Sequence, residues 1–161
     1  MTLETGTKLG RYEIRSKIGE GGMGEVYLAE DMQLRRRVAL KILPPEIAAN
    51  QDRMRRFVQE AQAAAALNHP NIAHIYEIGR SPTLREGSDT GSTGEDETHF
   101  IAMEYVEGVT LREKIHSERT SLLKLLKYLA QVAEGLAKAH AAGIVHRDLK
   151  QIGRASCRER V

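Results

Sequence analysis

The sequence predicts an α+β fold in which a small antiparallel sheet with one helix leads into a helical region. Over residues 11–30, polar and apolar residues alternate around a cluster of glycines, which is typical of a β-hairpin. Over residues 46–67 the period changes, and apolar residues recur every three or four positions as in an amphipathic helix. A longer, leucine-rich helical pattern covers residues 121–142. The sequence contains no internal repeats.

Three further strands complete the predicted sheet. A third strand is expected at about residues 36–43, and it ends at Pro44 and Pro45, which cannot continue a strand ladder. Residues 72–78 and 100–106 are apolar segments of strand length. With the hairpin, these segments predict a five-stranded antiparallel sheet.

The helices after the sheet have recognisable ends. A short helix is expected at 111–115 with Thr110 as its N-cap, because a threonine hydroxyl accepts hydrogen bonds from the first turn. The helix over 121–142 is expected to stop at Gly143, because glycine readily adopts the left-handed conformation that follows many helices.

Residues 81–98, between the last two strands, consist mainly of Gly, Ser, Thr and acidic residues. Such a stretch cannot bury enough apolar surface to fix its backbone, so we expect a flexible insertion. A regulatory loop controlled by phosphorylation is the alternative interpretation.

Composition and charge are those of an ordinary soluble protein. Of 161 residues, 41% are hydrophobic and 29% charged. No apolar run is long enough to cross a bilayer, and the N-terminus is not a signal peptide, so we expect a cytoplasmic, reducing location. The only cysteine, Cys157, can form no internal disulfide. Residues 152–161 hold three of the 24 basic and one of the 22 acidic residues, so the net charge of +2 arises there. We therefore expect no nucleic-acid partner.

Glycines in the hairpin follow the spacing G-x-G-x-x-G-x-V, which lets a backbone approach phosphates and direct its N–H groups at them. Dinucleotide-binding folds use a similar run, but there the loop opens a helix. Here a strand follows the loop, which predicts a hairpin tip that covers a nucleotide; a glycine-rich turn without a ligand is the simpler alternative. The segment is Gly19, Glu20, Gly21, Gly22, Met23, Gly24, Glu25 and Val26.

Lys41 is predicted on an inward-facing position of the third strand, where an unpaired ammonium group is costly to bury. It therefore needs anions, and phosphates are one candidate. Glu60, beside Phe57 and Ala61 on the following helix, is another. The alternative for Glu60 is a solvated helix glutamate.

With the motif His146-Arg147-Asp148-Leu149-Lys150, these features resemble the protein kinase family, particularly its bacterial serine/threonine receptor-kinase branch. The resemblance covers about residues 8–150. It is carried by RYEIRSKIGEGGMGEVYLAED at 11–31, RFVQEAQAAAALNHPNIAHIYEIG at 56–79 and FIAMEYVEGVTL at 100–111.

The resemblance implies a kinase N-terminal lobe, with a five-stranded antiparallel sheet plus the αC helix, joined to the first helices of the C-terminal lobe. It implies phosphoryl transfer from ATP, with Mg²⁺, to serine or threonine hydroxyls of protein substrates. Met103 would be the gatekeeper, and Glu104 and Val106 would offer backbone groups to adenine. The residues that would surround the nucleotide are Ile18, Gly19, Glu20, Gly21, Gly22, Met23, Gly24, Val26, Ala39, Lys41, Met103, Glu104 and Val106.

Four residues would carry the chemistry. Asp148 would orient the substrate hydroxyl and accept its proton, and Lys150 would stabilise the transferring phosphoryl group. A Lys41–Glu60 pair would position the lysine for the α- and β-phosphates. The lysine two places after the aspartate resembles the serine/threonine class rather than the tyrosine class. His146 would be structural, and Arg147 would pair with a phosphorylated activation loop.

The sequence departs from the family after Lys150. Gln151 stands where the family has proline, and Gly153 where it has a magnesium-binding asparagine. No D-F-G motif follows, so this chain would hold no metal ligand, and we expect the 161-residue chain to be inactive. Residues 152–161 resemble the translation of a short-read sequencing adapter, which predicts a tail that is not native.

The predicted organisation is therefore a leader at 1–11, a partial kinase domain at 12–150 and a non-native tail at 151–161. Within the domain, the N-lobe covers about 12–103, the hinge about 104–108 and the start of the C-lobe 109–150. A non-catalytic nucleotide-binding pseudokinase or scaffold is the alternative function. The sequence leaves open a membrane anchor elsewhere in the full-length protein.

Overall fold

A computed structural model of the chain describes residues 3–21, 24–84, 97–117 and 120–145. The chain divides into two compact units. The first contains residues 1–61 and 75–105, and the second contains residues 62–74 and 106–161. The chain crosses between the units after Ala61, after His74 and after Tyr105, and the last crossing falls inside the segment expected to be the hinge.

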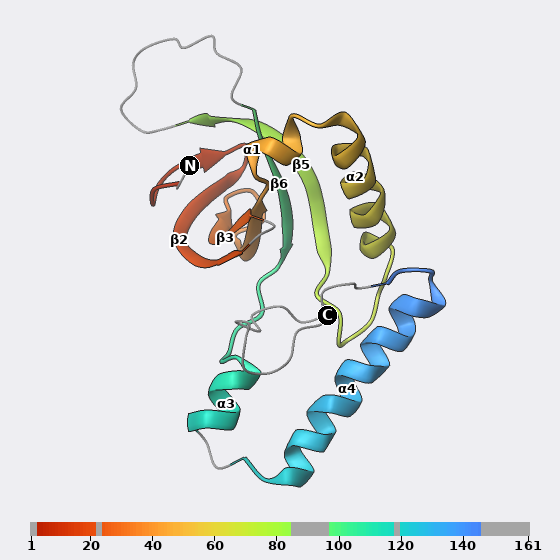
Figure 1. Ribbon diagram of the computed structural model, residues 1–161. Helices are drawn as coiled ribbons and strands as arrows, with labels where there is room; N and C mark the ends of the chain where they lie inside the picture. The colour runs from red at the N-terminus through yellow and green to blue at the C-terminus, as the bar shows by residue number, and fades with distance from the viewer. Residues whose placement is uncertain (1–2, 22–23, 85–96, 118–119, 146–161) are drawn as a thin grey trace. The chain divides into compact units, whose positions relative to one another are not determined.

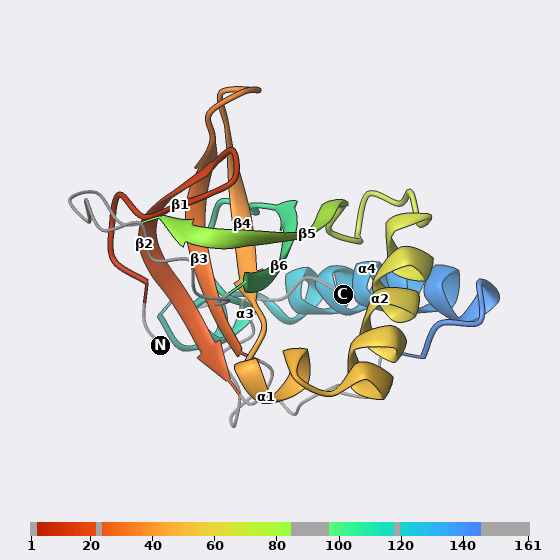
Figure 2. The ribbon, with the colours of Figure 1, turned by 90° about the horizontal axis from the view of Figure 1, so that it is seen from above.

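The strands of the first unit form an antiparallel barrel (Figure 1). Around the barrel their order is β1, β2, β3, β4, β6, β5, and β1 closes it by pairing with both β2 and β5. Figure 2 shows β2, β3 and β4 side by side, as the hairpin and the third predicted strand require. The strands are β1 (Lys8–Leu9), β2 (Tyr12–Gly21), β3 (Gly24–Asp31), β4 (Arg36–Ile42), β5 (Ile75–Leu84) and β6 (Glu97–Glu104).

Strand β1 is an addition to the five predicted strands, and it lies in the segment expected to be a leader. Leu3 and Leu9 are buried in the barrel core, so this segment packs as part of the first unit. Its two residues are too few to show an alternating pattern, so the sequence carried no signal for this strand.

The barrel interior is filled by side chains from alternate positions of the strands, as a half-buried sheet requires. Tyr12 and Phe100 meet edge to face there, with ring centroids 5.6 Å apart. The core residues are Leu3, Leu9, Tyr12, Ile14, Tyr27, Ala29, Val38, Leu40, Ile42, Phe100 and Ala102.

The remaining two strands differ from the predicted ranges. The segment predicted at 72–78 begins as a turn, in which the Ile72 amide donates to the His69 carbonyl at 3.0 Å, and becomes strand only at Ile75. Strands β5 and β6 then extend into the predicted insertion, where Ser81 pairs with Thr98 and Pro82 with Glu97. Backbone pairing thus continues through polar residues, and the rest of the insertion, 85–96, lies outside the described residues.

The single helix predicted over 46–67 is wrong in one respect, because the structure has two helices there. Helix α1 covers Pro45–Ala48 and helix α2 covers Gln51–Ala65. The break comes at Asn50, whose side-chain oxygen accepts from the Arg53 amide at 2.9 Å. Asparagine is among the best N-cap residues, so it starts a new helix rather than continuing the first one.

Helices α3 (Leu111–Ser117) and α4 (Leu122–Ala141) belong to the second unit and confirm the two predicted helices. Thr110 Oγ1 accepts from the Glu113 amide at 3.1 Å, and Glu113 Oε2 accepts from the Thr110 amide at 2.7 Å, which is a capping box. Ser121 caps α4 at the Lys124 amide, and Gly143 follows the helix with a φ of +77°.

Residues 67–74 pack against α4 within the second unit. The Asn71 side chain donates to Glu134 at 3.2 Å, and Gly135 is buried against the Asn71 backbone. Elsewhere on α4, four leucines are at least half exposed: Leu122, Leu123, Leu126 and Leu129. Within the part of the chain that is described, no helix is both long and apolar enough to span a membrane.

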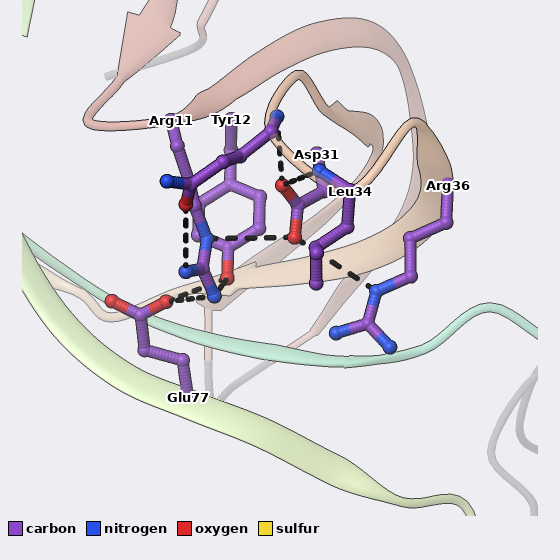
Figure 3. A network of polar contacts seen from close by, with 7 residues as sticks. Arg11, Tyr12, Asp31, Leu34, Arg36 and Glu77 are labelled. Atoms are coloured by element: carbon purple, nitrogen blue, oxygen red, sulfur yellow. Dashed lines mark hydrogen bonds and ion pairs between the residues drawn. The ribbon is translucent and has the colours of Figure 1, made fainter.

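A polar network fixes the end of the β2–β3 hairpin opposite its glycines (Figure 3). Asp31 is fully buried, and its Oδ1 accepts from the amides of Gln33 and Leu34 at 3.1 and 3.0 Å. Its Oδ2 lies 3.4 Å from Nε of Arg11 and 3.8 Å from Nε of Arg36. The carboxylate therefore holds the β3–β4 turn and the start of β2 together.

Candidate nucleotide-binding and catalytic site

One face of the barrel wall collects most of the predicted nucleotide-binding side chains. Directly opposed residues on neighbouring strands share a face. Val26 pairs with Lys41, and Lys41 pairs with Ile101, so these three lie in one row. Leu28, Ala39 and Met103 form the next row. We call this surface the outer face, because it lies opposite the barrel core.

The outer face corrects the expectation that Lys41 occupies an inward-facing position. The inward positions of β4 are Val38, Leu40 and Ile42, all in the barrel core. Lys41 alternates with them and is only partly buried. Its side chain therefore lies on the outer face, where a bound nucleotide is predicted. This position agrees better with a role in phosphate binding than a position in the barrel core would.

The glycines of the hairpin differ in what they permit. Gly24 has a φ of +111°, and a Cβ placed there would come within 2.0 Å of the Ile42 carbonyl oxygen. A side chain at this position is excluded by both conformation and space. At Gly21, a Cβ would meet no atom of the described residues within 4 Å. Gly22 and Met23 lie outside the described residues.

A β-bulge sets the faces of Ile18, Gly19 and Glu20. Lys17 pairs with Tyr27, and Gly19 pairs with Val26, so Ile18 is an extra residue in β2. Both Ile18 and Gly19 then lie opposite Val26, on the outer face. Glu20, the next residue, pairs with Glu25 on the opposite, inner side.

The sequence analysis did not predict a charged cluster at the glycine end of the β2–β3 hairpin. Nζ of Lys17 lies 2.6 Å from Glu20 Oε2 and 2.5 Å from Glu25 Oε1. The Tyr27 hydroxyl donates to Glu25 Oε2 at 2.6 Å and accepts from the Leu3 amide at 2.9 Å. The two acidic residues in the glycine segment were the available signal, because neighbouring carboxylates need a cation.

The contacts in this cluster shift the pKa values of its side chains. The hydrogen bonds that Lys17 donates to Glu20 and Glu25 raise the pKa of Lys17. Burial would raise the pKa of Glu25, but the hydrogen bonds from Lys17 and Tyr27 outweigh it and lower that pKa. Burial, followed by the bond to Glu25, raises the pKa of Tyr27. Lys17 and Glu25 are therefore charged, and Tyr27 neutral, at neutral pH.

The structure does not bring Glu60 to Lys41. Glu60 is exposed on α2, and the ion pairs among the described residues do not include one between these two side chains. The pairing remains a prediction.

The predicted adenine contacts divide at the boundary between the units. Met103 lies on the outer face, and Glu104 pairs with Val38 at the end of β6, both in the first unit. Val106 begins the second unit. Asp148 and Lys150, together with His146 and Arg147, lie outside the described residues.

The outer face has an apolar wall, glycines and a lysine, which are groups that an adenine nucleotide would require. Ile18, Val26, Ala39 and Met103 would contact the base, and Lys41 would contact phosphate oxygens. Among the described residues, no three His, Cys, Asp or Glu side chains gather as a metal site.

Comparison with known proteins decides the family. The family model of the protein kinase domain matches residues 12–152. The chain belongs to the protein kinase family. Its kinase domain is 44% identical over 142 residues to the serine/threonine-protein kinase PrkC of Bacillus subtilis (strain 168), covering 88% of this chain and 20% of that protein. It is 40% identical over 141 residues to the serine/threonine-protein kinase PknB of Mycobacterium tuberculosis (strain ATCC 25618 / H37Rv), covering 87% of this chain and 21% of that protein.

Solved structures give the same family. The crystal structure of the M. tuberculosis PknI kinase domain superposes with a TM-score of 0.70 and is 30% identical, covering 92% of this chain and 55% of that one. The chain thus spans about a fifth of the length of the curated kinases it matches, and about half of a solved kinase domain. The predicted α+β kinase fold, with an antiparallel N-lobe sheet and the first helices of the C-lobe, is confirmed.

Proposed function

We propose that the full-length protein carrying this chain is a protein kinase that transfers the γ-phosphoryl group of ATP to serine or threonine hydroxyls of proteins. One observation carries the proposal: Ile18, Gly19, Val26, Ala39, Lys41 and Met103, scattered over 86 positions, share the outer face of one barrel wall. The names of the similar kinases, PrkC and PknB, support the serine/threonine class. So does Lys150, two places after Asp148.

The residues of this chain would act by positioning and by electrostatics. The apolar outer face would hold adenine, and the backbone N–H groups of the glycine segment would hold phosphate oxygens. Lys41 would fix the α- and β-phosphates, and Glu60 would hold Lys41 once α2 turns it toward the lysine. Asp148 would orient the attacking hydroxyl and accept its proton, while Lys150 would stabilise the transferring group. Mg²⁺ would neutralise charge between the phosphates, through ligands that follow Lys150 in the family.

The test is phosphoryl transfer by the full-length protein, followed with ATP labelled at the γ-phosphate and a generic protein substrate. Asp148→Asn is expected to lower kcat by about 10²-fold or more, because it removes the proton acceptor. Lys41→Met is expected to raise KM for ATP and to lower kcat. Label recovered on tyrosine instead of serine or threonine would contradict the substrate class.

A pseudokinase is the second candidate, and the exposed position of Glu60 favours it. This candidate predicts ATP binding with no transfer above that of Asp148→Asn. The 161-residue chain itself is expected to show no transfer, because it has no asparagine or D-F-G after Lys150. Transfer by the purified 161-residue chain above its own Asp148→Asn control would overturn that expectation.

A further inference from the structure

Two carboxylates lie inside the segment that is proposed to cover the nucleotide phosphates. Glu20 and Glu25 belong to the same glycine hairpin as Gly19, Gly21 and Gly24. A carboxylate facing a triphosphate would oppose binding, since two like charges 8 Å apart near a protein surface repel by roughly 0.5–2 kcal/mol. The hairpin therefore needs a way to keep both side chains off the phosphate side.

The bulge at Ile18 provides the first part of that arrangement. Regular alternation from Lys17, which faces the inner side opposite Tyr27, would put Glu20 on the outer face. The extra residue shifts the alternation by one position, so that Gly19 pairs with Val26 and Glu20 pairs with Glu25. The outer face receives a glycine, and the acidic side chain turns to the inner side.

Lys17 provides the second part. In an unbroken strand, residues three apart point to opposite faces, so Lys17 could not contact Glu20. With the bulge they share the inner side, where Nζ lies 2.6 Å from Glu20 and 2.5 Å from Glu25. One ammonium group therefore holds both carboxylates, one on its own strand and one on the partner strand.

The cluster is partly buried and is connected to the barrel by hydrogen bonds. The Lys17 and Glu25 side chains are 30% and 23% exposed, whereas Glu20 is 75% exposed. Glu25 also accepts from the hydroxyl of Tyr27, whose side chain is fully buried, and that hydroxyl accepts from the Leu3 amide. Glu25 is thus fixed by two donors, and Glu20 depends on Lys17.

We propose that Lys17 is a positioning residue for ATP, which holds Glu20 and Glu25 on the inner side of the hairpin and so keeps negative charge away from the phosphates. The inference rests on the proposed function, because it assigns a means of nucleotide discrimination to the same site. Without Lys17, the exposed Glu20 side chain is no longer held on the inner side, and its repulsion acts on phosphates but not on adenosine.

The experiment compares the full-length protein with its Lys17→Met variant. KM for ATP is expected to rise about threefold to tenfold, with kcat changed by less than about twofold, because the repulsion acts on binding. The dissociation constant of ATP is expected to rise by the same factor while that of adenosine stays constant. Adding 0.5 M NaCl should shrink the difference, since salt screens exposed charges.

Arg15→Met is the matched control, because Arg15 makes the same kind of double ion pair on the same hairpin. It bridges Glu13 and Glu30, at 2.5 Å each, but it lies at an earlier register shift, between Ile14 and Ser16, away from Ile18 and the glycines. KM for ATP should not change in this variant. Lys17→Arg should restore KM, and Glu20→Gln added to Lys17→Met should also restore it, because the uncompensated charge is then gone.

The outcomes separate this inference from the proposed function. If Lys17→Met changes the affinities for ATP and adenosine equally, or if Arg15→Met has the same effect, Lys17 acts only on structure and the inference is wrong. An unchanged KM and affinity also overturn it. If the unaltered protein transfers no phosphate, the proposed function fails, and the ratio of ATP to adenosine affinity still decides the role of Lys17.

Discussion

The two ends of the β2–β3 hairpin use the same kinds of residue for different purposes. At the end away from the glycines, Tyr12, Arg11 and Asp31 form a network (Figure 3) around a fully buried carboxylate. At the glycine end, Lys17 and Glu25 with their neighbours form a cluster that is partly open to solvent. Each end combines a tyrosine hydroxyl, a cation and carboxylates.

The difference lies in what each carboxylate would lose if its partners were removed. Asp31 is closed off from water and depends on two backbone amides and two arginines. Glu20 is 75% exposed, so water can replace Lys17 at almost no cost. The first end is therefore built for stability. The second can change conformation at little energetic cost, which suits a segment that is proposed to admit and release a nucleotide.

The largest expected effect follows from breaking the buried end. Asp31→Ala removes the acceptor for the amides of Gln33 and Leu34 and leaves Arg11 and Arg36 without their shared carboxylate. We expect the free energy of unfolding to fall by about 3 kcal/mol, measured by urea denaturation of the full-length protein. Glu20→Ala is the control at the glycine end and should change it by less than about 0.5 kcal/mol. Equal losses in the two variants would contradict the comparison.

A smaller effect on stability is expected from substituting two glycines at the glycine end of the hairpin. Gly24→Ala should cost about 2 kcal/mol, because the backbone has a φ of +111° and the new Cβ would strike the Ile42 carbonyl oxygen. Gly21→Ala should change stability by less than about 0.5 kcal/mol, because a Cβ there meets nothing among the described residues. Thermal denaturation of both variants measures the difference, and an equal loss would show that the hairpin relaxes around either side chain.

The smallest effect concerns the pH dependence of stability that the two buried tyrosines contribute. Burial, together with the hydrogen bond to Glu77, raises the pKa of Tyr12 to about 12. The unfolded value is about 10, so the folded state keeps the proton longer, and this stabilisation is present below pH 10 and lost as the pH rises toward 12. We expect unfolding free energy measured from pH 8 to 11 to fall less steeply in Tyr12→Phe than in the parent, by about 1 kcal/mol at pH 11.

Tyr27→Phe extends the same measurement to the glycine end. Burial raises the pKa of Tyr27 as well, so removing its hydroxyl should also flatten the alkaline loss. It should in addition weaken the hold on Glu25, which Tyr12→Phe leaves intact. A Tyr12→Phe curve with the parent's slope would contradict the contribution of the buried phenol.

Much of the fold could be predicted because local patterns were strong. The alternation of β2 to β4, the helix period of α4 and the caps at Thr110 and Gly143 each rest on residues close in sequence. Prediction failed where the sequence pattern was too short or where the structure depended on a contact with another part of the chain. Strand β1 has two residues, and Asn50 splits a helix whose apolar period continues across it.

The candidate site shows the same division. Motif spacing alone indicated the glycine segment, Lys41 and the residues from 146 to 150. The face that each side chain takes was not readable from the motif, and Lys41 was assigned to the wrong one. The reason is that Val38, Leu40 and Ile42 occupy the positions of β4 that face the barrel core. Only the pairing of β4 with β3 and β6 shows which positions these are.

The sequence by itself determined the family, the order of the elements and the residue types of the site, because these depend on composition and spacing along the chain. The tertiary structure decided which residues lie on the outer face, where the nucleotide is proposed to bind. The extra residue at Ile18, the second of two register shifts in β2, puts Glu20 on the same side as Lys17. Such a bulge is defined by pairing between two strands, so one strand read alone cannot reveal it.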